Sequence, residues 1–155
     1  MKMKFEEILD RDGILVYRTR GTSMEPMLRQ NRDLVVIRPS AARLRRFDAA
    51  LYRRGEMYVL HRVIRVKDGY YLIRGDNTFA LETVPDDAVL GALTEFQRKG
   101  KTISAQSRGY RFYVRFWNAI YPLRYLYHGC RRLAVKAARR LGILPLLKKI
   151  LRRGK

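Results

Sequence analysis

Seven short runs of β-branched and aromatic residues, separated by turn residues, constrain the fold more than any other feature. They cover residues 14–20, 33–38, 49–53, 57–66, 70–74, 89–96 and 102–105. Lys67-Asp68-Gly69 joins two of these runs and is typical of a β-hairpin, because Asp-Gly favours a tight turn. Closely spaced strands predict a mainly β fold, an antiparallel barrel or sandwich. A short helix around Phe5, Ile8 and Leu9 precedes them and stops at Asp12-Gly13.

The charge distribution divides the chain into two parts. Residues 1–95 hold 17 Lys/Arg and all 14 Asp/Glu, whereas residues 96–155 hold 17 Lys/Arg and no acidic residue. Aromatic residues also become dense in the second part, between Tyr110 and Tyr127. We therefore expect a β domain over residues 1–108, with its core at 14–95, and a basic, aromatic-rich, partly helical extension over residues 109–155.

Residues 131–141 predict a basic amphipathic helix, because apolar residues repeat every three to four positions and Lys and Arg lie around the other face. The apolar positions are Leu133, Ala134, Ala137, Ala138 and Leu141. Gly142 and Pro145 interrupt the helix, and a last short piece covers residues 146–151.

Three surroundings suit this extension. We favour an anionic membrane surface, where aromatic rings settle at the headgroup level and cations meet acidic lipids. Packing on the β domain or on a partner protein is the second. Nucleic acid, with arginine on phosphate and aromatic rings on bases, is the third and the least favoured. His128 lies in this region, and we interpret it as structural or interfacial.

Several other classes of protein are disfavoured. Cys130 is the single cysteine, so no internal disulfide can form, and no Cys/His cluster has the spacing of a zinc site. We expect neither a metal nor another cofactor. The sequence predicts no N-terminal signal peptide and no transmembrane helix, since it lacks a run of about 18 apolar residues. A peripheral membrane location is therefore expected, with the cytoplasm as the alternative.

A candidate nucleophile lies between the first two strands, within Gly21-Thr22-Ser23-Met24-Glu25-Pro26-Met27-Leu28. Gly21 allows a sharp turn, and Pro26 prevents a regular ladder from continuing. A serine on such a turn has an exposed hydroxyl beside free backbone amides, which a nucleophile and an oxyanion hole need. An ordinary turn serine has the same pattern, so the motif needs partners elsewhere in the chain.

His61 is the only histidine before residue 109, and it lies in an otherwise largely apolar strand. The period of two places it on the same face as Val59 and Val63, toward the interior or a cleft. Gly75-Asp76-Asn77 follows the next strand and places a carboxylate at its end. A buried structural histidine and an Asx turn would show the same residues. A serine peptidase would use them as a base and as the acid that orients it.

Gly21-Thr22-Ser23-Met24-Glu25-Pro26, His61-Arg62-Val63-Ile64 and Gly75-Asp76-Asn77, in this order and at this spacing, resemble the signal peptidase I family. That family shares its fold with the self-cleaving domain of the SOS repressor. The resemblance covers about residues 14–95, and it also includes Asp33-Leu34-Val35-Val36, Phe47 to Tyr52 and Val84 to Gly91. It implies a β core of that type and an extended peptide or protein substrate along residues 14–20.

The resemblance also implies roles at the serine turn. Ser23 would be the nucleophile, and its own backbone amide would donate to the oxyanion. The surrounding substrate and oxyanion site would be formed by Gly21, Thr22, Met24 and Pro26. Two features depart from the family. Gly21 replaces a serine whose hydroxyl would donate to the oxyanion, and the usual N-terminal membrane anchor is not predicted.

The base and its carboxylate follow in the same way. His61 stands where typical bacterial members have lysine, and it is similar to the archaeal and endoplasmic-reticulum type with a Ser–His dyad. A histidine needs little tuning to act near neutral pH. Asp76 matches the family's aspartate, and a second acid of the related type would correspond to Glu82. We favour Asp76 over Glu82 as the carboxylate next to His61.

The sequence thus predicts a serine endopeptidase of signal-peptidase type. Its substrate would be an exported protein or a ribosomally made precursor peptide, with small residues before the cleaved bond. The alternatives are a repressor-like regulator and a non-catalytic peptide-binding or nucleic-acid-binding module on the same fold. No Ala-Gly-type self-cleavage loop precedes Ser23, which disfavours the regulator. The substrate and the oligomeric state are not predicted.

Overall fold

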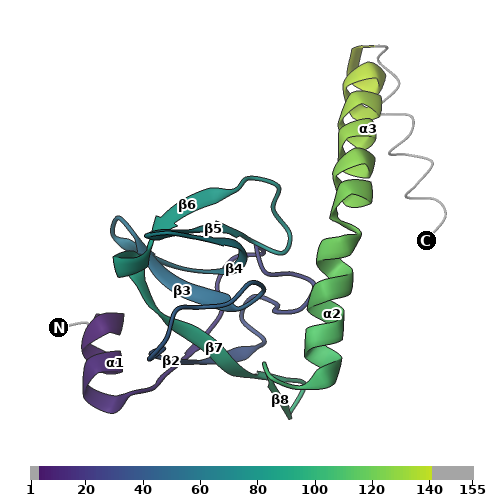
Figure 1. Cartoon of the computed structure of the whole chain (residues 1–155). Coiled ribbons are helices and arrows are strands. Elements are labelled where there is room, and N and C mark those ends of the chain that lie inside the picture. The colour runs from purple at the N-terminus through teal and green to yellow at the C-terminus, as the bar shows by residue number, and fades with distance from the viewer. Residues whose placement is uncertain (1–3, 141–155) are drawn as a thin grey trace. The chain divides into compact units, whose positions relative to one another are not determined.

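A computed structural model describes residues 4–140 of the chain (Figure 1). The chain forms two compact units, residues 1–118 and 119–155, and each is described by itself. The first unit contains all the strands and the helix α1 (Phe5–Asp12), and almost all of α2 (Arg108–Ala119). The second contains α3 (Tyr121–Arg140). The predicted end of the last helix at Leu141 and the piece at residues 146–151 lie outside the described residues.

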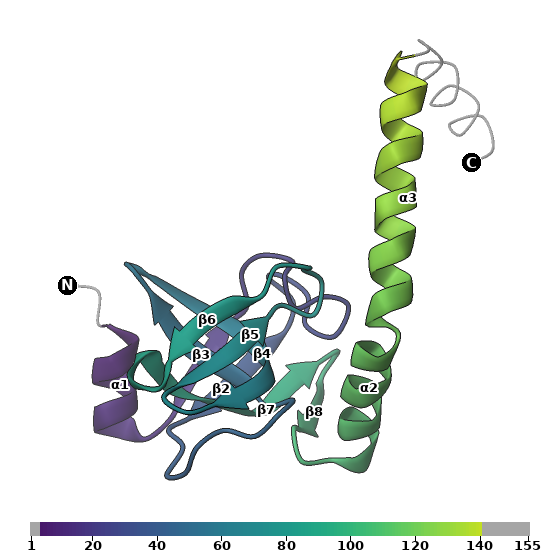
Figure 2. The ribbon, with the colours of Figure 1, turned by 45° about the horizontal axis from the view of Figure 1, so that its top comes forward.

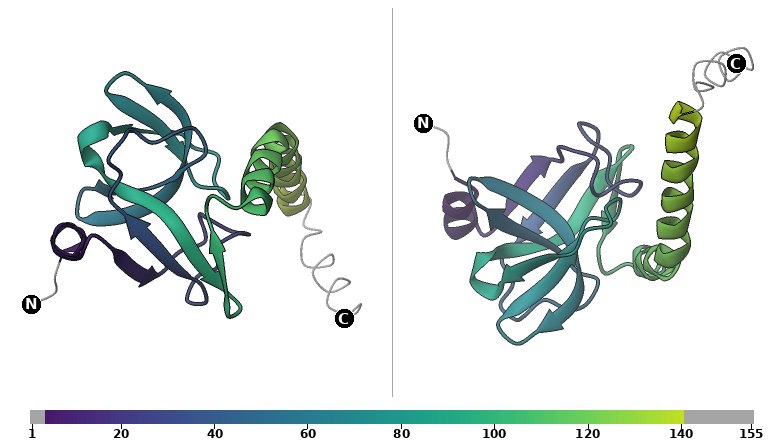
Figure 3. Two further views of the ribbon diagram at one scale, coloured as in Figure 1. Left: turned by 60° about the horizontal axis from the view of Figure 1, so that its bottom comes forward. Right: turned by 90° about the horizontal axis from the view of Figure 1, so that it is seen from above.

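Eight antiparallel strands form one sheet in the order β1-β2-β7-β3-β4-β5-β6, and β8 pairs with β7 off this path. Their bounds are β1 (Leu15–Arg18), β2 (Leu34–Arg38), β3 (Ala49–Arg54), β4 (Met57–Lys67), β5 (Tyr70–Arg74), β6 (Glu82–Pro85), β7 (Val89–Arg98) and β8 (Lys101–Ser104). The mainly antiparallel β prediction is confirmed. The sheet is curled but not closed, because β1 and β6 are its two ends and do not pair (Figures 2 and 3). A closed barrel is therefore not formed.

The turns follow the predicted chemistry. Asp68 and Gly69 connect β4 to β5, and Gly69 has a φ of 79°, which favours glycine. Lys99 and Gly100 connect β7 to β8 in a second hairpin. The short helix also ends as predicted, at Gly13 in the left-handed conformation. Strand β6 was not predicted as a separate strand, because it has only four residues, of which two are polar and the last is proline.

Strand β3 lies between two apolar clusters, which explains its continuous Ala-Ala-Leu-Tyr run. Ala49 and Leu51 pack on one side, and Ala50 and Tyr52 on the other. The first cluster also contains Leu9, Leu15, Met24, Met27, Leu28, Val35, Ile37, Leu60, Leu93, Phe96, Tyr110 and Val114. The second contains Leu44, Val63, Tyr71, Ile73 and Val84. Since β4 pairs with β3, successive residues of β4 also face opposite sides.

Helix α2 packs on the first cluster through Tyr110 and Val114, which lie one turn apart and are buried. Its next turn continues this face, where the Trp117 indole N–H donates to the Asp76 carbonyl oxygen at 2.9 Å. Figure 1 shows α1 and α2 at opposite sides of the strands. The aromatic stretch therefore begins with a helix that packs on the β unit, which is the second of the surroundings expected for this region.

Helix α3 of the second unit leaves large apolar side chains exposed. They are Leu123, Tyr125, Leu126, Tyr127 and Leu133. The helix predicted over residues 131–141 is thus the last part of a longer one that starts at Tyr121. None of the helices within residues 4–140 is long and apolar enough to cross a membrane.

Candidate active site

The loop between β1 and β2 presents Ser23 on a compact series of turns. The N–H of Glu25 donates to the Thr22 carbonyl oxygen at 3.1 Å, and the N–H of Leu28 donates to that of Met24 at 3.0 Å. Met24 and Leu28 are buried in the first cluster, whereas Ser23 is half-buried. Apolar side chains thus hold the loop in the core and leave the serine at its surface.

Two other residues of the predicted serine motif have clear local roles. Gly21 has a φ of 81°, a conformation that other residues rarely adopt, and its N–H donates to the Gln30 side chain. Pro26 is half-buried. The backbone N–H of Ser23 donates to no other residue within 4–140, so it is available to a substrate oxygen.

The Gly75-Asp76-Asn77 turn lies directly against the serine loop. The N–H of Asn77 donates to the Ser23 carbonyl oxygen at 2.7 Å, and its side-chain amide donates to that of Thr22 at 3.2 Å. A Cβ at Gly75 would lie 2.7 Å from the Ser23 carbonyl oxygen, which only glycine avoids. Two motifs that are about fifty residues apart in the sequence are therefore in contact.

His61 lies on β4 and is 5% exposed. It faces the second cluster with Tyr52, as the pairing of β3 with β4 requires. The ring Nδ1 is 3.2 Å from the Tyr52 hydroxyl oxygen and 3.5 Å from Glu82 Oε1. The Tyr52 hydroxyl donates to Glu82 Oε2 at 2.8 Å. These three side chains form one hydrogen-bonded network.

The network favours one tautomer of the neutral imidazole. A hydroxyl carries a single proton, and Tyr52 uses it toward Glu82. Nδ1 of His61 then carries the proton and donates to the Tyr52 oxygen, which leaves the Nε2 lone pair to accept a proton. This is the protonation state of a histidine that acts as a general base.

The pKa values agree with this state. Burial lowers the pKa of His61 below 6.5, and the Glu82 carboxylate opposes that shift without cancelling it. Burial alone would raise the pKa of Glu82, but hydrogen bonds from Tyr52 and Arg54 bring it below its usual value. Arg54 contacts both Glu82 oxygens, at 3.1 and 3.0 Å. Glu82 is thus ionised while the imidazole is neutral near pH 7.

Asp76 is placed differently from the expectation. It lies in a buried ion pair with Arg62, with Arg62 Nε at 2.9 Å from Oδ1 and Nη2 at 2.6 Å from Oδ2. The preference for Asp76 over Glu82 as the carboxylate next to His61 is therefore corrected. The reason is strand alternation, because His61 and Arg62 are neighbours on β4 and point to opposite faces. Each takes a different carboxylate.

Arg62 is fully buried, and its Nη1 donors are also used. Nη1 donates to the Phe47 carbonyl oxygen at 2.9 Å and to the Tyr110 hydroxyl at 2.8 Å. The Asp76 carboxylate more than offsets burial and raises the pKa of Arg62. The pair links β4, the turn after β5 and α2. The turn after β5 also binds the Ser23 loop. Asp76 is therefore a support of the serine loop.

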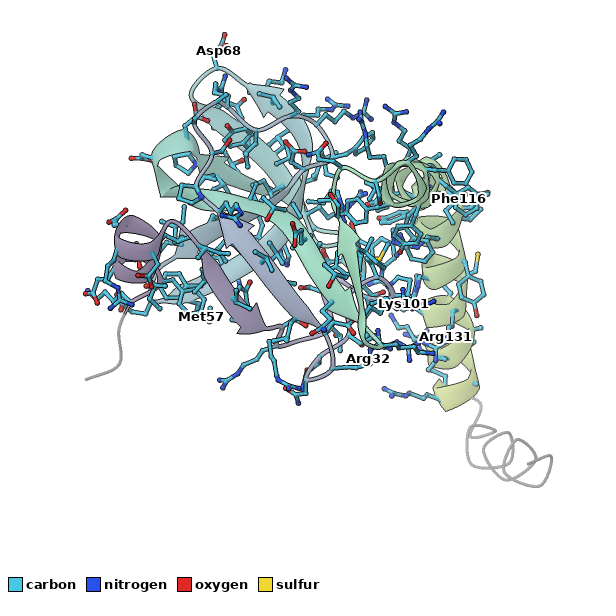
Figure 4. The ribbon with its side chains drawn as sticks, turned by 90° about the horizontal axis from the view of Figure 1, so that it is seen from below. Arg32, Met57, Asp68, Lys101, Phe116 and Arg131 are labelled. Carbon is cyan, nitrogen blue, oxygen red and sulfur yellow. The ribbon has the colours of Figure 1, made fainter. Side chains whose placement is uncertain are left out.

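Ser23, His61 and Glu82 line one cavity of about 1200 Å³ in the first unit. Gly21 and Met24 also line it, whereas Thr22, Pro26 and Asp76 do not. Figure 4 labels Met57, another lining residue, beside α1. No hydrogen bond joins Ser23 to His61 among the described residues. The predicted nucleophile and base thus line the same cavity.

Sequence reasoning missed Tyr52, Arg54 and Trp117. Tyr52 could have been found, since a hairpin around Gly55 pairs it with Val59 and places it diagonally from His61. Trp117 gave no signal, because nothing in the aromatic stretch shows which ring reaches the Asp76 turn. Among residues 4–140 no group of three or more His, Cys, Asp or Glu side chains could hold a metal ion.

Comparison with known proteins adds no assignment. No protein-family model matches the chain, and no curated protein matches it. The arrangement of the described side chains is therefore the ground for any functional proposal.

Proposed function

We propose that this protein is a serine endopeptidase of signal-peptidase type, on the β core that this family shares with the self-cleaving domain of the SOS repressor. The observation that carries the proposal is the His61–Tyr52–Glu82 network on the wall of a cavity that Ser23 also lines. A neutral, oriented imidazole and a surface serine are the parts that acyl transfer needs.

In the first step, the Ser23 hydroxyl oxygen attacks the carbonyl carbon of the peptide bond. His61 Nε2 takes the hydroxyl proton, and the ring becomes an imidazolium whose Nδ1–H faces Tyr52 and Glu82. The negative charge of Glu82 stabilises that imidazolium. The oxyanion receives the backbone N–H of Ser23, which has no other acceptor within residues 4–140.

In the second step, the tetrahedral intermediate collapses and the C–N bond breaks. His61 returns its proton to the leaving amine, and the acyl group remains on the Ser23 oxygen. Water then attacks the ester with His61 again as the base, which releases the acid product and restores the serine. Catalytic hydrogen bonds often tighten only when substrate is bound, so the separation of Ser23 and His61 is compatible with this role.

The substrate would be an extended segment of an exported protein or of a ribosomally made precursor peptide. Within residues 4–140, strand β1 ends the sheet and pairs on one side only, with β2. Tyr17, Arg18 and Thr19 of this edge line the cavity. An extended peptide can add to such an edge through backbone hydrogen bonds. A peptide bound in this way would lie across the opening of the cavity, toward Ser23.

A fluorophosphonate probe tests the proposal without a known substrate, because it labels only activated serine nucleophiles. We expect one label on Ser23 of the full chain and none in Ser23→Ala or His61→Ala. Ser40→Ala and His128→Ala are matched controls, since neither residue lines the cavity, and they should label normally. Equal labelling of His61→Ala would remove the proposed base. An unlabelled wild-type chain that still binds peptides would favour the non-catalytic module.

We also propose that the aromatic and basic region contacts an anionic membrane. On α2, Phe112 and Phe116 stack at 6.4 Å and are 72% and 52% exposed. Figure 4 shows Phe116 on the outer side of this helix. Arg111 and Arg115 are exposed beside them. Aromatic rings flanked by cations suit the headgroup region of a bilayer.

Flotation with vesicles tests this contact while keeping α2, whose buried face supports the β unit. We expect the wild type to float with vesicles containing phosphatidylserine, and Phe112→Ser/Phe116→Ser to float several-fold less. Val16→Ser/Val66→Ser is the control, since both residues are exposed elsewhere on the first unit. Equal flotation of the wild type and the Phe112/Phe116 variant would exclude α2 from membrane contact.

A further inference from the structure

The charge of the cavity is unbalanced on the side of β1. Its cationic lining residues are Lys4, Arg18, Arg20, Arg53 and Arg54, and its carboxylates are Glu56 and Glu82. Arg54 pairs with Glu82 at 3.0 Å, and Arg53 is 3.5 Å from Glu56. Within residues 4–140 neither Arg18 nor Arg20 has a carboxylate within 4.0 Å. The cavity lining thus includes two arginines, together with Lys4, whose side-chain charges have no close carboxylate among the described residues.

The cavity lining is richer in cations than the unit that surrounds it, with five cations and two carboxylates. Residues 1–95 contain 17 Lys/Arg and 14 Asp/Glu, which is close to balance. Some exposed arginines of this unit pair with a carboxylate, as Arg43 does with Asp86 at 2.9 Å, whereas others within residues 4–140, such as Arg38 and Arg65, have none within 4.0 Å. Arg18 donates to the Asn31 carbonyl oxygen at 3.1 Å, which fixes its direction but gives it no carboxylate partner.

Both arginines lie along the path of an added strand. Arg18 is the last residue of β1, and the ladder continues to Thr19, whose N–H donates to the Asp33 carbonyl oxygen. Arg20 follows before the serine turn. At the rise of about 3.3 Å per residue of a fully extended chain, Arg20 can lie at most about 10 Å from Ser23 and Arg18 at most about 17 Å, and the bend at Gly21 shortens both distances. An extended peptide beside this edge passes both before it reaches the serine.

We propose that the cavity selects extended peptides with acidic side chains within about five residues of the cleaved bond. This inference rests on the proposed peptidase function and names its substrate class. An arginine guanidinium binds a carboxylate through two parallel hydrogen bonds, so two arginines at this spacing read two acidic positions of a strand. The cationic field of the cavity also speeds the arrival of an acidic peptide.

Binding to the Ser23→Ala full chain tests the inference apart from catalysis. The probes are rhodamine-labelled peptides of about 13 Ala, Ser and Gly residues, with Asp, Asn or Lys at the third and fifth positions on both sides of a central Ala. We expect the Asp peptide to bind at least about tenfold more tightly than the Asn peptide by fluorescence anisotropy. Added Arg18→Gln/Arg20→Gln should reduce that preference to less than about twofold.

The matched control carries the same change of net charge. Arg38→Gln/Arg65→Gln alters two exposed arginines that do not line the cavity, and it should retain the preference for Asp. Arg18→Glu/Arg20→Glu should instead prefer the Lys peptide. Equal loss in the control variant would show that acidic peptides follow the overall charge and would overturn the inference. Equal affinity for Asp and Asn peptides, or no binding of any peptide, would also overturn it.

The two proposals fail in different ways. If the wild type is not labelled by the fluorophosphonate but the Asp preference depends on Arg18 and Arg20, the peptidase proposal fails and the acidic-peptide site remains. If Ser23 is labelled and neutral peptides bind as well as acidic ones, the peptidase proposal remains and the inferred substrate class fails.

Discussion

Two neighbouring residues of β4 hold their carboxylate partners in opposite ways. Arg62 lies in the first cluster and is bound to Asp76 by two hydrogen bonds, with both side chains almost completely buried. His61 lies on the other face and reaches Glu82 at 3.5 Å and through Tyr52, on the wall of the cavity. The Glu82 side chain is 26% exposed. The Arg62–Asp76 pair is closed to solvent, whereas the His61–Glu82 pair is open to the cavity.

The two pairs should therefore have different roles. The buried pair would stabilise the fold, and the open network would take part in the proposed proton transfer. The buried pair has its two charges bound to each other away from solvent. The open network contains a neutral imidazole that can take a proton and a carboxylate that can stabilise the product. Mutations of the two faces should therefore change different quantities, the free energy of unfolding on one side and the protonation of His61 on the other.

The largest effect is expected from breaking the buried pair on one side. Asp76→Ala leaves the Arg62 guanidinium buried without its carboxylate, and we expect a loss of about 3–5 kcal/mol in the free energy of unfolding. Glu82→Ala should cost about 1 kcal/mol or less, because Glu82 is partly exposed. Urea unfolding of the full chain measures both. Equal losses for the two variants would contradict the comparison.

A smaller loss is expected when both members of the buried pair are replaced together. Arg62→Met/Asp76→Leu removes both charges, so no unpaired charge remains in the core. We expect this double variant to be more stable than either single variant, although the Phe47 carbonyl and the Tyr110 hydroxyl lose a donor. The same urea titration gives the coupling between the two residues. A double variant that loses the sum of the two single losses would show that the residues do not act as a pair.

The sequence predicted the strand and the turns of the site better than it predicted which carboxylate pairs with His61. The serine turn, the histidine strand and the Gly-Asp-Asn turn could be predicted, because strand periodicity and turn residues are local properties. Gly75 contacts Ser23, which agrees with the interpretation of the two turns as parts of one site. The choice of carboxylate could not be predicted. It depends on β6, a strand too short to predict, whose pairing places Glu82 opposite Ile73.

Packing of the aromatic region on the β domain was one of the expected surroundings, but the residues of α2 that make this contact could not be predicted. Tyr110, Val114 and Trp117 lie on its inner side, while Phe112 and Phe116 are exposed. Aromatic residues on both sides hide the period that normally reveals a buried face. As a result, the Tyr110 hydroxyl on Arg62 and the Trp117 N–H on the Asp76 carbonyl were not expected. The helix that suggested a membrane segment is also a support of the serine loop.

On the open face, two substitutions should move the pKa of His61 in opposite directions. Burial lowers this pKa most, Glu82 and Asp76 raise it, and Arg54 lowers it. Glu82→Gln removes a charge that favours the imidazolium, so the pKa should fall further. Arg54→Gln removes a charge that disfavours it, so the pKa should rise. The acid limb of Ser23 labelling against pH should move with it, to lower pH in the first variant and to higher pH in the second.

Proton NMR provides a direct measurement of the same shifts. The chain has two histidines, so His128→Gln leaves one imidazole signal to titrate. Arg65→Gln is a control for the lost positive charge, since Arg65 is exposed and does not line the cavity. It should leave the His61 titration unchanged. Shifts of the same sign in Glu82→Gln and Arg54→Gln would exclude the network as the cause.

The smallest expected effect is on the free energy of unfolding, through the protonation of His61 on the open face. The folded pKa of His61 lies below its unfolded value of 6.5 because burial disfavours the imidazolium. In the window between the two values the unfolded chain binds more protons, so the free energy of unfolding falls as pH decreases through it. His61→Gln should flatten this decline as the pH falls below about 7. Urea titrations across that window, with His128→Gln as the control, test whether the acid sensitivity of the fold comes from the open face. A slope that His61→Gln does not alter would assign it to other groups.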